Sequence, residues 1–122
     1  MKVLIIEDDK FIQDFYAFKL KEKNFIVEVA SDGEEGLQKI VDGQPDVILL
    51  DLVMPKKDGF EVLQEMANKN LLEKIPVLVF STLSQTKDVE RVKALGARNV
   101  VNKSFFDFDK LLATIFEVTK SV

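Results

Sequence analysis

The chain has 122 residues, 17 of them basic and 21 acidic, so its formal net charge is −4. This length corresponds to one domain, and a hydrophobic content of 47% is enough for a core. The acidic balance argues against a protein that holds nucleic acid by itself, and the absence of cysteine and histidine excludes a disulfide framework, thiol redox chemistry and imidazole catalysis. Because no apolar stretch approaches the roughly 20 residues of a membrane helix, we expect a soluble cytoplasmic protein.

Short apolar runs alternate with segments of helical periodicity along the whole chain. The first half predicts strands over 3–6, 25–30 and 47–50, a helix over about 10–23, and a helix that is capped by Ser31 or Asp32 and stops at Gly43. The second half predicts a helix opened by Asp58-Gly59, a strand ending near Phe80, a helix that begins after Ser84 or Thr86 and ends at Gly96, a strand over about 99–102, and a helix over about 106–119. In this last helix we expect Leu111, Leu112, Ile115 and Phe116 to face inward.

Five strand–helix repeats predict an α/β fold, a doubly wound parallel sheet with five helices distributed over both faces. The strand over 25–30 is the most polar, which favours an edge position. The resulting strand order is 2-1-3-4-5, and it reverses between the strands at 3–6 and 47–50. Ligands of such sheets bind beyond the carboxyl ends of the strands, at this reversal.

Reactive side chains follow four of the predicted strands directly. Glu7 and Asp8 follow the first strand, Asp51 the third, Ser81 the fourth and Lys103 the fifth. Since the carboxyl ends of parallel strands meet at one rim, we expect three acids, a hydroxyl and an ammonium group to converge there.

Three carboxylates a few ångströms apart repel one another unless a cation lies among them. Hard oxygen ligands suit Mg²⁺, and a metal held there can also contact a phosphoryl oxygen. Lys103 adds a positive charge suited to phosphate and Ser81 adds a hydroxyl. Asp51 is then the candidate nucleophile, which would form an aspartyl phosphate.

These residues resemble the motifs of response-regulator receiver domains of two-component signalling, over essentially all of residues 1–122. Ser81 follows Asp51 by 30 positions and Lys103 follows it by 52, as in that family. The other matching motifs are Glu7-Asp8, Asp51-Leu52-Val53-Met54-Pro55, Asp58-Gly59 and Gly96-Ala97. The resemblance implies a flavodoxin-like fold and a single receiver domain over 1–122.

The same resemblance implies a metal site built around Asp51, the phosphoacceptor. Asp8 and Asp51 would bind Mg²⁺ directly, Glu7 would hold it through water, and Val53 would contribute its backbone carbonyl.

The resemblance also implies catalytic roles for Lys103, which pairs with the acceptor and then with the phosphoryl group, and for Ser81, which bonds a phosphoryl oxygen. The phosphoryl donor would be a histidine kinase or a histidine phosphotransfer protein. Phosphorylation would switch the face formed by the helix ending at Gly96, the strand over 99–102 and the helix over 106–119, which would then bind a downstream protein. Such a domain catalyses its own phosphorylation and slow dephosphorylation, but it is mainly a signalling switch.

Three features depart from the family pattern. Val100 replaces the usual aromatic residue, so we expect output through backbone or helix movement, and Ser104 replaces the usual proline, so we expect a trans Lys103-Ser104 bond. Apolar Val53 and Leu83 flank the site and should hinder an attacking water, which predicts a long-lived phosphorylated form.

Alternative functions are weaker. A phosphatase with an aspartyl nucleophile needs a second acid where Val53 stands, and an electron carrier would find its flavin phosphate repelled by Glu7-Asp8-Asp9. A degenerate receiver that signals by protein contact without phosphorylation stays open, and the chain could be a stand-alone receiver or a fragment of a longer regulator.

We expect Asp9 and Asp58 to be helix caps.

Overall fold

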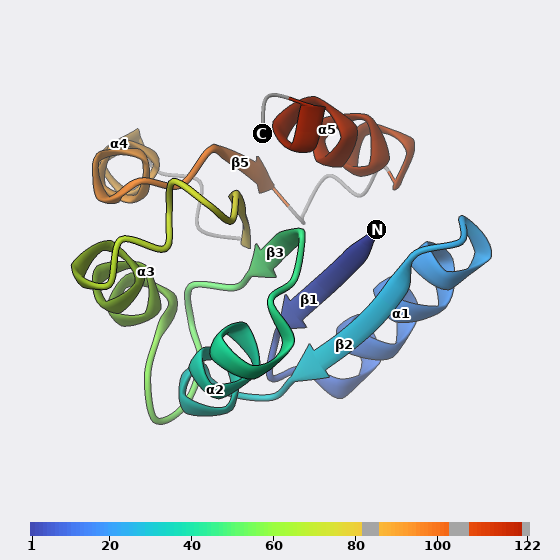
Figure 1. The fold of residues 1–122 in the computed structure, drawn as a ribbon, viewed down its shortest axis with the longest axis horizontal. Coiled ribbons are helices and arrows are strands. Elements are labelled where there is room, and N and C mark those ends of the chain that lie inside the picture. Colours follow the sequence, from blue (N-terminus) through green and yellow to red (C-terminus); the bar gives the residue numbers. More distant parts are fainter. Residues whose placement is uncertain (82–85, 103–107, 121–122) are drawn as a thin grey trace.

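The strands form one parallel sheet in the order β2-β1-β3-β4-β5, as predicted (Figure 1). The structure, a computed structural model, describes residues 1–81, 86–102 and 108–120. The strands are β1 (Lys2–Ile6), β2 (Ile26–Ala30), β3 (Val47–Leu50), β4 (Val77–Ser81) and β5 (Asn99–Asn102). β2 lies at an edge and pairs with β1, so the prediction from its polarity is confirmed.

The helices are α1 (Lys10–Glu22), α2 (Gly33–Gly43), α3 (Gly59–Asn68), α4 (Thr86–Leu95) and α5 (Phe108–Lys120). Asp9, Asp32 and Asp58 are the N-caps of α1, α2 and α3, and each carboxylate accepts a hydrogen bond from the backbone N–H three residues later, at 3.2, 2.8 and 2.9 Å. Asp9 and Asp58 therefore have the capping role predicted for them. None of the helices in the described part of the chain has the length and apolar character to cross a bilayer.

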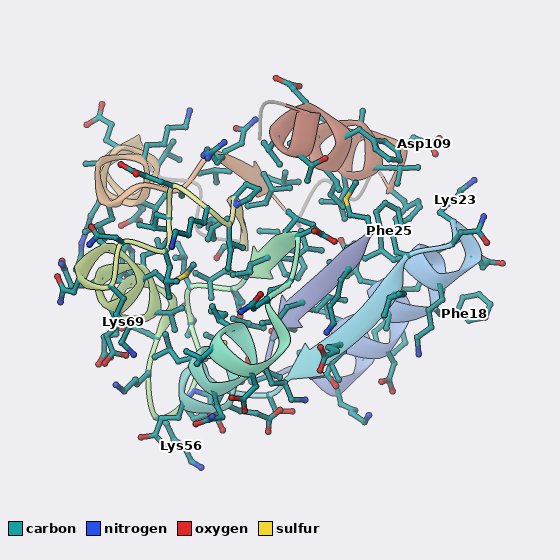
Figure 2. The ribbon with its side chains drawn as sticks, in the orientation of Figure 1. Phe18, Lys23, Phe25, Lys56, Lys69 and Asp109 are labelled. Atoms are coloured by element: carbon teal, nitrogen blue, oxygen red, sulfur yellow. The ribbon has the colours of Figure 1, made fainter. Side chains whose placement is uncertain are left out.

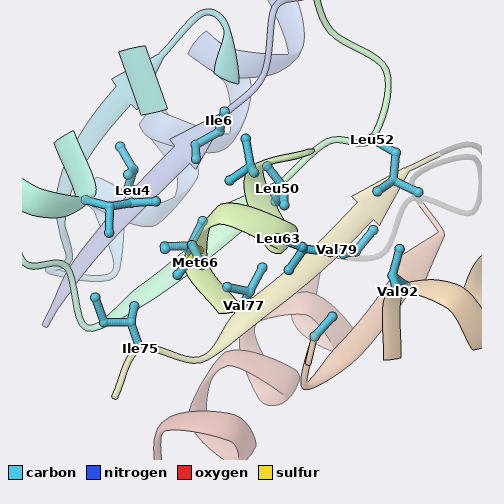
Figure 3. Close-up of a cluster of buried hydrophobic side chains, with 14 of the residues drawn as sticks. Leu4, Ile6, Leu50, Leu52, Leu63, Met66, Ile75, Val77, Val79 and Val92 are labelled. Carbon is cyan, nitrogen blue, oxygen red and sulfur yellow. The ribbon is translucent and has the colours of Figure 1, made fainter. Parts of the chain in front are cut away.

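Two apolar cores lie on opposite faces of the sheet because successive strand residues point to opposite sides. Helices α2, α3 and α4 cover one face and helices α1 and α5 cover the other (Figure 1). Figure 3 shows the first core, in which strand side chains pack against α3 and α4; its members include Leu4, Ile6, Leu50, Val79, Leu63, Met66 and Val92. The second core includes Val3, Ile5, Leu49, Leu78, Phe80, Tyr16, Leu20, Leu111 and Ile115.

The outward faces of α1 and α5 carry large apolar side chains. On α1, Phe11 and Phe18 are 79% and 63% exposed, and Figure 2 shows Phe18 pointing away from the sheet. On α5, Leu111 and Ile115 face inward as predicted, but the prediction was wrong for Phe116, which is half exposed. Its ring lies at the rim of the second core, 5.8 Å from the ring of Phe25 between centroids.

Candidate functional site

The strand register places the first two acid-bearing strand ends side by side. Ile6 of β1 is paired with Leu50 of β3, and the ladder continues one step further because the backbone N–H of Asp51 donates to the carbonyl of Ile6 at 3.0 Å. On the other side of β1, the N–H of Glu7 donates to the carbonyl of Ala30 at 3.0 Å. Glu7 and Asp51 therefore leave the sheet at the same level, next to the reversal of strand order.

Glu7, Asp8 and Asp51 form an acidic cluster. One carboxylate oxygen from each lies within 4.8 Å of the others. Glu7 is fully buried and Asp51 is 4% exposed, whereas Asp8 is exposed. At this separation each pair of negative charges repels by on the order of 3 kcal/mol if the effective dielectric constant is about 20. The donor set is oxygen only and open to solvent at Asp8, which fits a hard divalent cation such as Mg²⁺ that keeps part of its water shell.

The β3–α3 loop orients Asp51. Its Oδ1 accepts a hydrogen bond from the backbone N–H of Leu52 at 2.9 Å, and the carbonyl of Leu52 accepts from the N–H of Gly59 at 2.9 Å. Gly59 lies directly against this segment, since a Cβ atom at position 59 would stand 2.5 Å from the carbonyl oxygen of Asp51. The start of α3 is therefore held against the backbone of the candidate phosphoacceptor.

The remaining predicted site residues are placed in part. Ser81 ends β4, is 1% exposed, and is paired in register with Asn102, the residue before Lys103. Lys103 itself, together with Ser104 and Leu83, lies outside the described residues, so the predicted trans bond and the predicted role of Lys103 stay predictions. Val53 is 62% exposed beside Asp51.

A buried amide lies close to the acids and was not singled out from the sequence. Gln13 of α1 is 2% exposed, and its Nε2 donates to the carbonyl of Glu7 at 3.0 Å. A signal was present: Gln13, Tyr16 and Leu20 share one helical face, so an amide stands on the face that otherwise enters the core. A buried polar side chain in such a row must find a partner.

Tyr16 belongs to the second core and lies near Glu7. Burial raises the pKa of its phenol above 10.0, and the negative charge of Glu7 raises this pKa further. The ring packs edge-to-face on Phe80, 5.1 Å between centroids, and Phe80 directly precedes Ser81. Tyr16 thus senses the charge of Glu7 from within the core.

Absorbance of tyrosinate should report this charge, because Tyr16 is the single tyrosine and there is no tryptophan. In the folded protein the pKa of Tyr16 should lie above 10.0. Glu7→Gln should lower this pKa but leave it above 10.0, since burial is the larger cause of the shift. Because folding raises the pKa of Tyr16, the stability that the neutral phenol contributes is fully present below the pKa of Tyr16 in the unfolded chain. It is lost as the pH rises through the pKa of Tyr16 in the folded protein. The pKa of Tyr16 in the urea-unfolded chain serves as the reference. If Glu7→Gln leaves the pKa of Tyr16 in the folded protein unchanged, the electrostatic contact with Glu7 is contradicted.

Comparisons with known proteins agree with this geometry. The family model "Response regulator receiver domain" matches residues 3–116. The transcriptional regulatory protein DltR of Streptococcus agalactiae is 36% identical over 94% of this chain and 50% of its own length, so the chain spans about half of that curated relative.

Two solved structures have the same fold over nearly the whole chain. The receiver domain of the Francisella response regulator 1452 has a TM-score of 0.91 and 32% identity, covering 98% of this chain and 97% of that one. One chain in the complex of CheX and CheY with BeF3 and Mg²⁺ from Borrelia burgdorferi has a TM-score of 0.88 and 27% identity, covering 97% of this chain and 88% of that one. With its β2-β1-β3-β4-β5 sheet and its acids at the strand reversal, the chain belongs to the family of response regulator receiver domains.

Proposed function

We propose that this receiver domain takes a phosphoryl group onto Asp51 from a histidine kinase or a histidine phosphotransfer protein, with Mg²⁺ bound beside it. The observation that carries the proposal is the cluster of Glu7, Asp8 and Asp51 at the strand reversal, in which a buried carboxylate lies beside two further acids. Intact mass after incubation with acetyl phosphate and Mg²⁺ tests it. A chain that gains no phosphoryl group would instead favour a receiver that signals by protein contact alone.

The acids of the cluster fit the metal that this chemistry needs. Asp8 and Asp51 would bind Mg²⁺ directly, Glu7 would hold it through water, and the carbonyl of Val53 would complete the protein ligands. When bound, the ion offsets the negative charge of the acids and polarises a phosphoryl oxygen. The Borrelia relative supports this assignment, since its complex contains both BeF3 and Mg²⁺.

The reaction itself uses the carboxylate of Asp51 as nucleophile. One of its oxygens attacks phosphorus, the bond from phosphorus to the donor's imidazole nitrogen breaks, and its electron pair returns to that nitrogen. The N–H of Leu52 restrains the carboxylate through Oδ1 before the attack, so little reorientation is required. Ser81 and Lys103 would stabilise the phosphoryl oxygens, Ser81 as a hydrogen-bond donor and Lys103 as a positive charge.

We further propose that residues 1–122 act as one receiver unit whose α4–β5–α5 face carries the signal to a downstream protein. Ser81 ends β4, and β4 is paired with β5 through Ser81 and Asn102, so a hydroxyl that moves toward the phosphoryl group acts on this face.

Phosphoryl loss should be slow, because Val53 presents an apolar side chain beside Asp51 where a polar one could hold the attacking water. Val53→Asn should speed the decay of the phosphorylated form several-fold, and Val53→Asn combined with Leu83→Glu should speed it further. The measurement is the phosphorylated fraction over time, by intact mass, after acetyl phosphate is removed. If the phosphorylated form of the double variant decays no faster than that of the wild type, Val53 and Leu83 do not slow phosphoryl loss.

Phe11 should help a protein donor to dock, because this exposed phenyl group lies in the first turn of α1, next to the acidic rim. Phe11→Ser should lower kcat/KM for transfer from a phosphorylated histidine phosphotransfer protein about tenfold, as expected for an apolar contact of this size. Labelling by acetyl phosphate should stay unchanged. Val41→Ser on α2, where Val41 is 53% exposed, is the matched control and should transfer normally.

A further inference from the structure

Gln13 joins the ends of two strands beneath the acidic cluster. Its Nε2 donates to the carbonyl of Glu7 at 3.0 Å, to the carbonyl of Ala30 at 3.4 Å and to the hydroxyl of Ser31 at 3.4 Å. All three acceptors lie at or just beyond the carboxyl ends of β1 and β2. Because Gln13 is only 2% exposed, water does not replace these contacts readily.

These bonds restrain the backbone from which two of the acids project. Since the peptide unit is planar, holding the Glu7 carbonyl also sets the direction of the Asp8 N–H and thereby the course of the chain into Asp8. The carbonyl of Ala30 accepts from both Glu7 N and Gln13 Nε2, at 3.0 and 3.4 Å, so the amide closes β2 onto β1 at Glu7. The N-cap residue of α1 also holds the Glu7 side chain, whose Oε2 accepts from the N–H of Asp9 at 3.3 Å.

The side chain at this position is a hydrogen-bond donor without charge. Burying an amide is unfavourable unless its polar atoms are bonded, so an apolar residue would fill the same space at less risk. A lysine could donate as well, but its ammonium group would bring a positive charge next to Glu7 and compete with a bound cation. The glutamine amide restrains the acids without neutralising their negative charge, which stays available to bind a cation.

We propose that Gln13 is a positioning residue of the acidic cluster, whose amide holds Glu7 and Asp8 in place so that the affinity for Mg²⁺ depends on it. This inference rests on the proposed function, because it assumes that the cluster binds the metal. Partners that orient metal ligands typically contribute 10- to 100-fold to affinity. Gln13 acts through a backbone carbonyl, so we expect about the tenfold end of that range.

Calorimetric titration with Mg²⁺ tests the dependence directly. Gln13→Met keeps the length and volume of the side chain but removes the donor, and it should weaken Mg²⁺ binding about tenfold. The matched control is Thr114→Val on α5, which also removes a buried polar group bonded to a backbone carbonyl, here that of Lys110 at 2.8 Å. Urea unfolding of both variants without Mg²⁺ gives their stabilities. The control should bind Mg²⁺ as the wild type does, whatever stability it loses.

A measurement on the wild type keeps the inference testable even if Gln13→Met does not fold. Coupling between two interactions is reciprocal, so Mg²⁺ must strengthen the Gln13 contact by the factor by which that contact strengthens Mg²⁺ binding. Exchange of the Gln13 side-chain amide protons, followed by NMR, should therefore slow about tenfold at saturating Mg²⁺. The Asp9 amide resonance should shift in the same titration, because its N–H is bonded to the Glu7 carboxylate.

The outcomes separate this inference from the proposed function. The positioning role is overturned if Gln13→Met binds Mg²⁺ with wild-type affinity. It is also overturned if saturating Mg²⁺ does not change the amide exchange rate of Gln13. Either result leaves the phosphoacceptor proposal intact. A tenfold loss that Thr114→Val shares also overturns the positioning role, since the effect would then follow general stability. A wild-type chain that does not bind Mg²⁺ at all overturns both.

Discussion

Asp51→Asn should abolish phosphoryl transfer to this chain. The amide of asparagine is a far weaker nucleophile than a carboxylate and removes one of the three negative charges of the cluster. Asparagine has nearly the same size, and its side-chain oxygen can still accept from the N–H of Leu52, so the fold should survive. The wild-type chain should gain one phosphoryl group from acetyl phosphate in the presence of Mg²⁺, and the variant none.

Asp9→Asn is the matched control for this experiment. It makes the same chemical change two residues from Glu7, but asparagine is as good an N-cap as aspartate and Asp9 caps α1. The control should therefore be phosphorylated at close to the wild-type rate. Phosphoryl addition that persists in Asp51→Asn would show another acceptor and would contradict the assignment of Asp51.

Gly59→Ala should destabilise the fold by about 1–3 kcal/mol, the usual range for adding a methyl group where packing leaves no space. Its Cβ would lie 2.5 Å from the carbonyl oxygen of Asp51 and 2.8 Å from the Cα of Leu52. Both are backbone atoms, so the start of α3 or the strand end that carries Asp51 must shift. We expect weaker Mg²⁺ binding as well, because the displaced segment carries Asp51 and Val53. Urea unfolding and calorimetry measure the two effects.

Gly43→Ala provides the corresponding control at the end of α2. A Cβ there would meet the side-chain oxygen of Glu28 at 2.8 Å, which is the far end of a flexible chain and can move. Alanine also favours the helix, so the net change in unfolding free energy should stay within about 1 kcal/mol of zero. If both alanine variants are equally stable and bind Mg²⁺ equally well, the contact of Gly59 with Asp51 does not restrain the site.

Local patterns in the sequence were sufficient for the layout of the sheet and for the helix caps. Val47–Leu50 is a purely apolar run, which is typical of a strand covered on both faces, and the structure places it at the centre of the sheet. Asp58-Gly59 predicts a helix start capped by Asp58, and in the structure Asp58 and Glu61 form both bonds of a capping box. Such features depend on neighbours within a few residues, so they can be predicted without knowing the fold.

On α1 the sequence pattern allowed two rows of side chains to face the sheet, and local features did not decide between them. Phe11, Phe15 and Phe18 form one helical row, and Gln13, Tyr16 and Leu20 form another. Hydrophobicity favours burying the phenylalanines, yet Phe11 and Phe18 are exposed and Gln13 is buried. The strand ends decide which row faces the sheet. The carbonyls of Glu7 and Ala30 accept hydrogen bonds from the amide of Gln13, whereas a phenyl ring has no donor for them.

The sequence by itself determined that acids, a hydroxyl and an ammonium group follow four of the five strands, because strand ends are marked by the change from apolar to polar residues. Only the tertiary structure decided that Glu7 is buried while Asp8 next to it is exposed, and that Gln13 and Gly59 support the acids from α1 and α3. These outcomes depend on how α1 and α3 pack against the ends of β1 and β3. The packing of the helices against the sheet sets such contacts, and no local pattern encodes it.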